Sequence, residues 1–363
     1  IKTICSVAAA ACLLFAVLCI IAVRLFPRPL LRLVINAGET QVINLAMQYL
    51  PIVAFSYLPY ALTAAMVGML KGVEVVRVTL YAALLSLISN VIFNYILIFG
   101  KFGFPALGIA GAAIGSSLAE LVSLVFFILY TRSRIDCKKY GLDRIPKFCM
   151  EVLKRMLNVS FWTMIQNFFS LSTWFLFFLY VEHLGERSLA VTNIIRNVSG
   201  ILFMVLMAFA STCGSLVSNL IGAGEKDCVA GTIRQHIRLG YMFVLPLALL
   251  FSLFPKLILG IYTDMPDLQD AAVHSLWVMC STYLFLVPAN VYFQAVSGTG
   301  NTRTALVMEL ITLVIYVAYI SYIILYLKMD VAFCWTSEMV YSTFILILCW
   351  NYIKRGRWQE KRI

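Results

Sequence analysis

Four ionisable side chains interrupt long apolar stretches of this sequence and are the first candidates for chemistry. They are Glu120, Arg196, Glu309 and Glu338. A charged side chain near the centre of a lipid bilayer costs about 2.5–3.5 kcal/mol on insertion scales, and residues kept there at that cost usually serve a function. A carboxyl group in such a setting can take up and release a proton or bind a cation. Ion binding at membrane depth is therefore the chemistry that these residues predict.

The positions of these residues within the predicted helices suggest different roles. Glu120 lies near the middle of its helix with no cation evident on its half of the chain, so it is either an ion-coupling residue or a neutral acid hydrogen-bonded to a neighbouring helix. Arg196 and Glu338 lie at equal depth in the second half, which predicts an ion pair with a structural or a coupling role. Glu309 lies about one turn inside its helix and can also simply reach water.

Neutral polar residues add candidates along the same helices. Asn90 and Asn94 are four residues apart and share one helix face, so they join Glu120 as ion-coupling candidates. The polar candidates of the second half are Gln166, Asn167, Asn290 and Gln294. Ordinary hydrogen bonds between helices are the alternative for all of them.

Aromatic residues are abundant and include candidates for a substrate cavity. These candidates are Tyr57, Trp162, Trp174 and Tyr283. The faces of Trp, Tyr and Phe rings bind flat organic cations well, especially near a carboxylate. Packing between helices and contact with lipid are the alternative roles.

The elements that must position these residues are membrane-spanning helices. Hydrophobic residues make up 62% of the 363 residues and charged residues only 12%, a composition far from that of a soluble domain. Continuously apolar runs of about 20 residues are long enough to cross a bilayer as helices, whereas barrel strands would alternate polar and apolar residues. We predict an all-α polytopic membrane protein with helices at 4–23, 42–69, 79–99, 107–130, 157–181, 189–221, 239–260, 272–296, 305–327 and 331–353.

Basic residues indicate the orientation of these helices, because cytoplasmic loops retain Lys and Arg. The segment 132–156 is rich in them, and with this segment inside, strict alternation places the 354–363 tail in the cytoplasm as well. Residues 145–156 resemble an amphipathic helix at the membrane surface. The net charge of +11 then reflects topology, and nucleic-acid binding is not expected.

Enzyme chemistry, metal binding and nucleotide binding all lack support in the sequence. The ten cysteines form no C-x-x-C pair and no histidine stands beside them at metal spacing, so no metal site or other cofactor is predicted. No cluster of catalytic groups gathers at one end of the helices. Gly298 and Gly300 precede Arg303, but the strand, third glycine and lysine of a phosphate-binding loop are missing, so a tight turn is predicted.

An internal repeat organises the chain. Aligning 49–77 with 275–303 without a gap matches Tyr57 with Tyr283, Gly72 with Gly298 and Arg77 with Arg303. We therefore expect an N-terminal lobe at 1–131, a basic linker at 132–156 and a six-helix lobe at 157–353. In this register the N-terminal lobe lacks its first two helices, so we expect ten of twelve helices, in agreement with a sequence that starts at Ile1 rather than methionine.

The sequence resembles the multidrug and toxic compound extrusion (MATE) transporters along essentially its whole length. The resemblance rests on SYLPYAL (56–62), NYILIFGKFGFPALGIAGAAIGSS (94–117), STCGSLVSNLIGAGEKD (211–227) and VSGTGNTRTAL (296–306). It implies two six-helix lobes around a central cavity. Some members carry Asn followed by Asp where this chain has Asn90 and Asn94. Some also carry acidic residues on the helices of Gln166, Asn167, Asn290 and Gln294. This chain lacks those acidic residues, so it lacks the negative ligands that the resemblance implies for cation binding.

The resemblance implies an antiporter that exports organic cations or toxic metabolites in exchange for H⁺ or Na⁺ by alternating access. We expect a monomer in the cell membrane, with small, mainly cationic molecules and the lipid bilayer as its partners. The alternative is a flippase for a lipid-linked saccharide of the same superfamily. Such proteins tend to line the cavity with many basic residues that hold pyrophosphate, and here the predicted membrane interior holds one arginine, Arg196.

Overall fold

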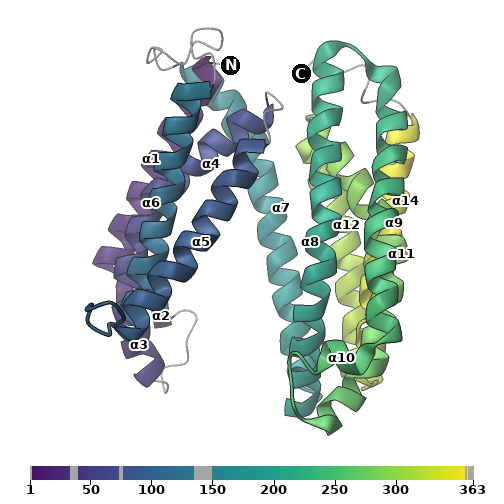
Figure 1. Ribbon diagram of the computed structural model, residues 1–363. Helices are drawn as coiled ribbons and strands as arrows, with labels where there is room; N and C mark the ends of the chain where they lie inside the picture. The colour runs from purple at the N-terminus through teal and green to yellow at the C-terminus, as the bar shows by residue number, and fades with distance from the viewer. Residues whose placement is uncertain (1, 33–39, 73–76, 135–148, 356–357, 359–363) are drawn as a thin grey trace. The chain divides into compact units, whose positions relative to one another are not determined.

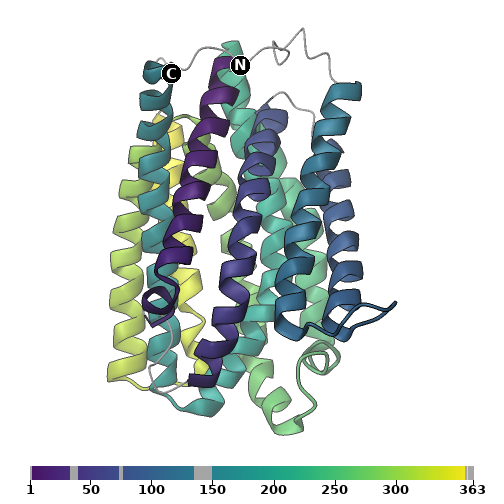
Figure 2. The same ribbon diagram turned by 90° about the vertical axis from the view of Figure 1, so that its left-hand side faces the viewer.

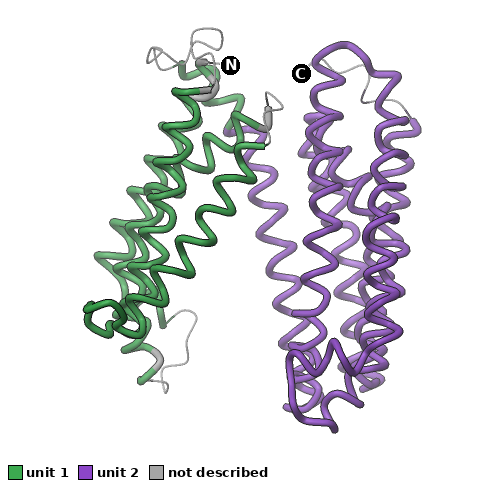
Figure 3. Tube along the Cα trace, in the orientation of Figure 1, with its two compact units in different colours: residues 1–156 green, residues 157–363 purple. Residues whose placement is uncertain are grey.

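The structure is a computed structural model that describes residues 2–32, 40–72, 77–134, 149–355 and 358. Every regular element within these ranges is a helix, and ten helical segments are long and apolar enough to cross a membrane. The predicted all-α polytopic class and the ten spans are confirmed. The chain divides into two compact units, residues 1–156 and 157–363 (Figure 3).

Unit 1 contains four of the spans. Its elements are α1 (Lys2–Leu25), α2 (Pro27–Arg32), α3 (Thr40–Val53), the short 3₁₀ turn η1 (Ala54–Ser56), α4 (Tyr57–Gly72), α5 (Arg77–Phe99) and α6 (Gly108–Arg134). Helix α1 packs along α4, and α5 packs along α6 (Figures 1 and 2). A Cβ atom on Gly111 of α6 would lie 2.5 Å from the Leu97 carbonyl oxygen of α5, so these two backbones approach as closely as glycine allows.

Unit 2 contains the other six spans. Its elements are α7 (Met150–Glu182, which begins in unit 1), α8 (Glu186–Ala223), η2 (Lys226–Cys228), α9 (Val229–Leu253), α10 (Pro255–Leu259), α11 (Pro266–Gly298), α12 (Thr302–Ile320), the π-helix η3 (Ser321–Tyr326), α13 (Val331–Cys334) and α14 (Ser337–Arg355). Helix α11 packs against α8, α9 and α14, and it contributes many fully buried side chains to the core of the unit.

Three predicted spans are interrupted, and the one at 239–260 breaks at Phe254, directly before Pro255. The span predicted at 42–69 breaks at η1, between Pro51 and Pro59, because each proline removes a backbone donor and its ring clashes with the carbonyl four residues earlier. The span predicted at 331–353 breaks at Trp335 and Thr336, where the Thr336 hydroxyl donates to the Phe333 carbonyl at 2.5 Å. A short polar side chain that bonds its own backbone in this way competes with the helical pattern.

Two further predictions concern where helices begin. Helix α9 begins at Val229 rather than 239, because the polar segment before 239 continues the helix instead of forming a loop. The predicted surface helix at 145–156 lies partly outside the described residues, which omit 135–148, and its described residues 150–156 form the first turns of α7.

The two segments aligned as a repeat end their helices at corresponding positions. Gly72 is the last residue of α4 and Gly298 is the last residue of α11, while Arg77 and Arg303 stand in the first turns of α5 and α12. Gly300 has a φ of +77°, which a glycine adopts without steric cost. The predicted tight turn is therefore present between α11 and α12.

Candidate functional site

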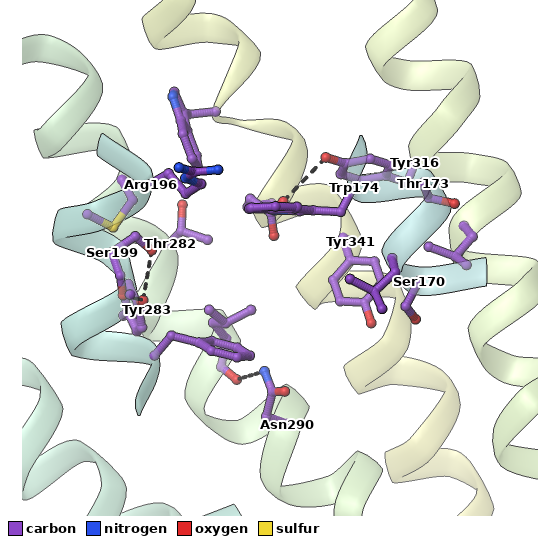
Figure 4. A pocket seen from close by; sticks show the side chains of 18 of the residues that line it. Ser170, Thr173, Trp174, Arg196, Ser199, Thr282, Tyr283, Asn290, Tyr316 and Tyr341 are labelled. Atoms are coloured by element: carbon purple, nitrogen blue, oxygen red, sulfur yellow. Dashed lines mark hydrogen bonds between the residues drawn. The ribbon is translucent and has the colours of Figure 1, made fainter. Parts of the chain in front are cut away.

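Unit 2 encloses a cavity of about 560 Å³, a size typical of small-molecule sites (Figure 4). Its walls come from α7, α8, α11, α12 and the α13–α14 segment. The lining residues are Ser170, Leu171, Thr173, Trp174, Arg196, Ser199, Gly200, Phe203, Met279, Thr282, Tyr283, Leu286, Asn290, Glu309, Leu313, Tyr316, Trp335, Glu338 and Tyr341. Three of the four ionisable candidates therefore meet in one place.

Glu309 is the most enclosed of these three. Its side chain is 1% exposed, and its carboxyl group touches hydroxyl groups from two other helices. The Ser170 hydroxyl of α7 donates to Oε1, and the Tyr341 hydroxyl of α14 lies 3.0 Å from Oε1 and 2.9 Å from Oε2. The expectation that Glu309 reaches water at a helix end is wrong, because α12 turns this residue towards α7 and α14.

Glu338 stands in the first turn of α14, directly after the break in the last span. Its Oε1 accepts a hydrogen bond from the Tyr316 hydroxyl of α12 at 3.3 Å. The N–H groups of Glu338, Met339 and Val340 donate to the Trp335 and Thr336 carbonyls, and the positive end of the helix dipole favours a negative charge at this position. The interruption at Trp335 and Thr336 therefore creates a setting for a carboxylate that an unbroken helix would lack.

Arg196 and Glu338 line the same cavity but do not form the predicted ion pair. Among the described residues, the guanidinium of Arg196 contacts ring faces instead, with its Cζ 5.8 Å from the Trp174 ring centroid and 5.3 Å from that of Phe178. The prediction rested on equal depth alone. Depth does not fix the direction of a side chain around its helix, and Arg196 turns towards the aromatic residues of α7.

The other predicted polar and aromatic residues of this unit divide into two groups. Trp174, Tyr283 and Asn290 line the cavity, where the Tyr283 hydroxyl donates to the Ser199 carbonyl at 2.8 Å and the Asn290 amide donates to the Leu286 carbonyl at 3.0 Å. The residues that do not line it are Trp162, Gln166, Asn167 and Gln294. Trp162 lies under the guanidinium of Arg303, with 5.4 Å from Cζ to the ring centroid.

The candidates of unit 1 form a smaller polar group. Asn90 donates to the Ser116 hydroxyl at 3.2 Å and accepts from the Asn94 amide at 3.0 Å, so these residues join α5 to α6. Glu120 is half-buried on α6 and makes no hydrogen bond or ion pair with any described residue. Tyr57 begins α4 after the η1 turn. The pair Asn90 and Asn94 fits an ordinary interhelical contact.

Several lining residues were not among the predicted candidates. Ser170, Tyr316 and Tyr341 supply the hydroxyl groups that contact the two carboxyls. A helical pattern in the sequence points to two of them, since Tyr341 follows Glu338 by three residues and Tyr316 follows Glu309 by seven. Ser170 is on a helix distant in the sequence, and only the packing of α7 against this site reveals its role.

The groups that line this cavity are suited to binding a charged small molecule. Two carboxyl groups, hydroxyl groups and aromatic faces suit an organic cation, and each carboxyl can also hold a proton. Figure 4 shows Arg196, Ser199 and Tyr283 on one side of the cavity and Tyr316, Tyr341 and Ser170 on the other. Charged groups of both signs thus line one space.

Comparison with known proteins gives consistent results. The MatE family model matches residues 1–96 and 163–323. The chain is 26% identical over 329 residues to the Thermotoga maritima protein named "Probable multidrug resistance protein NorM", covering 90% of this chain and 70% of that protein. A Bacillus cereus protein of the same name is 28% identical over 285 residues, which are 75% of this chain and 61% of the relative.

Solved structures share the fold. The structure described as "MATE transporter ClbM in complex with Rb+" superimposes with a TM-score of 0.80 at 18% identity, covering 98% of this chain and 79% of that one.

Proposed function

Because the chain belongs to the MATE family, we propose that it acts in an antiporter that exports organic cations or toxic metabolites in exchange for H⁺ or Na⁺. The cavity of unit 2 carries this proposal, since it combines two carboxyl groups with aromatic walls at membrane depth. The relatives are named as probable multidrug resistance proteins, which supports an export function. In an exchange mechanism, the two solutes must alternate in their access to the protein or compete for one charged site.

We assign the coupling ion to Glu309 and the substrate cation to Glu338. Glu309 is fully enclosed and contacts only hydroxyl groups, which can donate to its ionised form and accept from its protonated form. Its hydrogen-bond partners among the described residues are these two hydroxyls alone, which favours a proton over a metal ion at this carboxyl. Glu338 is partly open to the cavity, which it lines together with the 36% exposed Trp174, so a flat cation can contact an aromatic ring and pair with a carboxylate there.

We further propose that the protein is a monomer in the cell membrane with its C-terminus in the cytoplasm. The excess of basic residues in 132–156 and in the 354–363 tail supports this orientation. A flippase for a lipid-linked saccharide would need several basic groups for the pyrophosphate. Within the described lining of the cavity, Arg196 is the one basic residue, which favours the exporter.

Cells that express the full-length protein should extrude a cationic dye such as ethidium faster than cells without it. A protonophore that collapses the proton gradient and leaves the sodium gradient intact should abolish this difference in efflux rate, because Glu309 is assigned to a proton. The measurement is the rate of loss of dye fluorescence, with each gradient removed separately. Efflux that ignores both gradients would refute the antiporter, and efflux that follows sodium alone would refute the proton assignment.

A further inference from the structure

Arg196 has hydrogen-bonding capacity that the protein does not use. A guanidinium has five N–H donors, yet Arg196 makes no hydrogen bond or ion pair with the residues that the structure describes. Arg187, nine residues earlier on the same helix, instead donates to Asp267 at 2.6 Å. An arginine at membrane depth without an acceptor is costly, and such residues usually face a ligand pathway.

The contacts that Arg196 does make leave those donors available. Trp174 and Phe178 of α7 place their rings 5.8 Å and 5.3 Å from its Cζ, as cation–π contacts. The two rings are inclined at 63° to each other, so the guanidinium can lie flat on at most one of them, and neither ring provides an oxygen acceptor for its N–H groups. The two aromatic rings therefore orient the Arg196 side chain without accepting conventional hydrogen bonds from its N–H groups. The same residue lines the 560 Å³ cavity.

The carboxyl groups of the cavity do not neutralise Arg196. Glu309 contacts Ser170 and Tyr341, and Glu338 contacts Tyr316, which lies across the cavity from Arg196 in Figure 4. Arg196 and the two carboxyl groups therefore line the same cavity, and neither carboxyl forms an ion pair with Arg196. A molecule that carries both charges can satisfy both walls at once.

We propose that Arg196 binds a carboxylate of the transported molecule, so that the cavity selects amphoteric compounds with an aromatic cation at one end and a carboxylate at the other. The planar fork of arginine matches a carboxylate through two parallel hydrogen bonds. A single arginine suits a monoanion rather than a pyrophosphate. This inference rests on the proposed export function, because it names a class of exported molecule. Its test is a binding measurement that does not depend on transport.

Two dyes that differ in one group provide the test. Rhodamine 110 carries a cationic xanthene and a free benzoate, and rhodamine 123 is its methyl ester with the same cation. Binding of each dye to the purified full-length protein is measured by fluorescence anisotropy. Arg196→Gln should weaken binding of the acid dye by about tenfold or more, the loss expected for a charge-assisted hydrogen bond, and change binding of the ester dye by less than about threefold.

Matched variants separate this role from a structural one. Arg187→Gln removes the same charge from the same helix, and it should leave both dyes bound as in the unmodified protein. Arg196→Lys keeps the charge without the fork, so its affinity for the acid dye should fall between those of arginine and glutamine. Thermal unfolding of each variant checks that the fold is retained.

Two results would overturn the inference. Equal weakening of both dyes by Arg196→Gln would mean that Arg196 maintains the packing of α7 on α8 and does not bind the carboxylate. Absence of binding of the acid dye to the unmodified protein would also reject it, even if cells still export ethidium with a proton gradient. Conversely, selective binding of the acid dye without gradient-driven efflux would uphold the site and reject the antiporter.

Discussion

Glu309→Gln is expected to abolish dye efflux driven by the proton gradient while leaving the protein folded. Glutamine has nearly the shape of protonated glutamic acid, so the contacts with Ser170 and Tyr341 can persist. It cannot release a proton, however, so the carrier stays in the equivalent of its protonated form and exchange stops before the next substrate molecule binds. The coupled rate should fall by more than about tenfold, equivalent to about 1.4 kcal/mol, because this position no longer exchanges a proton.

The other carboxyl groups provide the comparison for this variant. In the same efflux assay, Glu338→Gln should raise the dye concentration needed for half-maximal efflux and retain dependence on the gradient, because Glu338 is assigned to the substrate. Glu120→Gln tests the competing site in unit 1, where the carboxyl has no partner among the described residues. If Glu120→Gln uncouples efflux and Glu309→Gln does not, the coupling site lies in unit 1 and the assignment of Glu309 is wrong.

The sequence predicts the spans well because membrane insertion depends on local composition. All ten apolar runs form spans, since a segment of about 20 apolar residues with satisfied backbone groups is stable in lipid almost regardless of its neighbours. The breaks at η1 and at Trp335–Thr336 are harder to foresee. Hydropathy averages over them, and the responsible features are two prolines and one threonine hydroxyl.

The site is predicted less completely because it depends on contacts between distant helices. Buried charge in an apolar run identifies Arg196, Glu309 and Glu338 without any structure. The side chains that contact these three residues cannot be predicted from the sequence in the same way. Equal depth suggests that Arg196 pairs with Glu338. In the structure, Arg196 contacts the rings of Trp174 and Phe178, and Glu338 accepts a hydrogen bond from Tyr316. The direction of a side chain around its helix is set by the packing of the whole unit.

Gly298→Ala is expected to destabilise unit 2, although alanine is normally the better residue in a helix. A Cβ atom at position 298 would lie 2.3 Å from the Gly214 carbonyl oxygen, which belongs to the backbone of α8. A backbone atom cannot rotate away, so α8 and α11 must separate, and α11 is the helix that packs against most of the unit. Forced overpacking of this kind costs about 1–3 kcal/mol.

A second glycine distinguishes this clash from a general effect of glycine replacement. Gly231 lies on the exposed side of α9, and a Cβ atom there would meet no other atom within 4 Å. Gly231→Ala should therefore be neutral or stabilise by up to about 1 kcal/mol through helix propensity. Thermal unfolding in detergent measures both variants, and each kcal/mol shifts Tm by roughly 2–4 °C in a unit of this size. A Gly298→Ala protein as stable as Gly231→Ala would show that α8 and α11 do not need this close approach, and the glycine would then matter only for the turn that precedes Arg303.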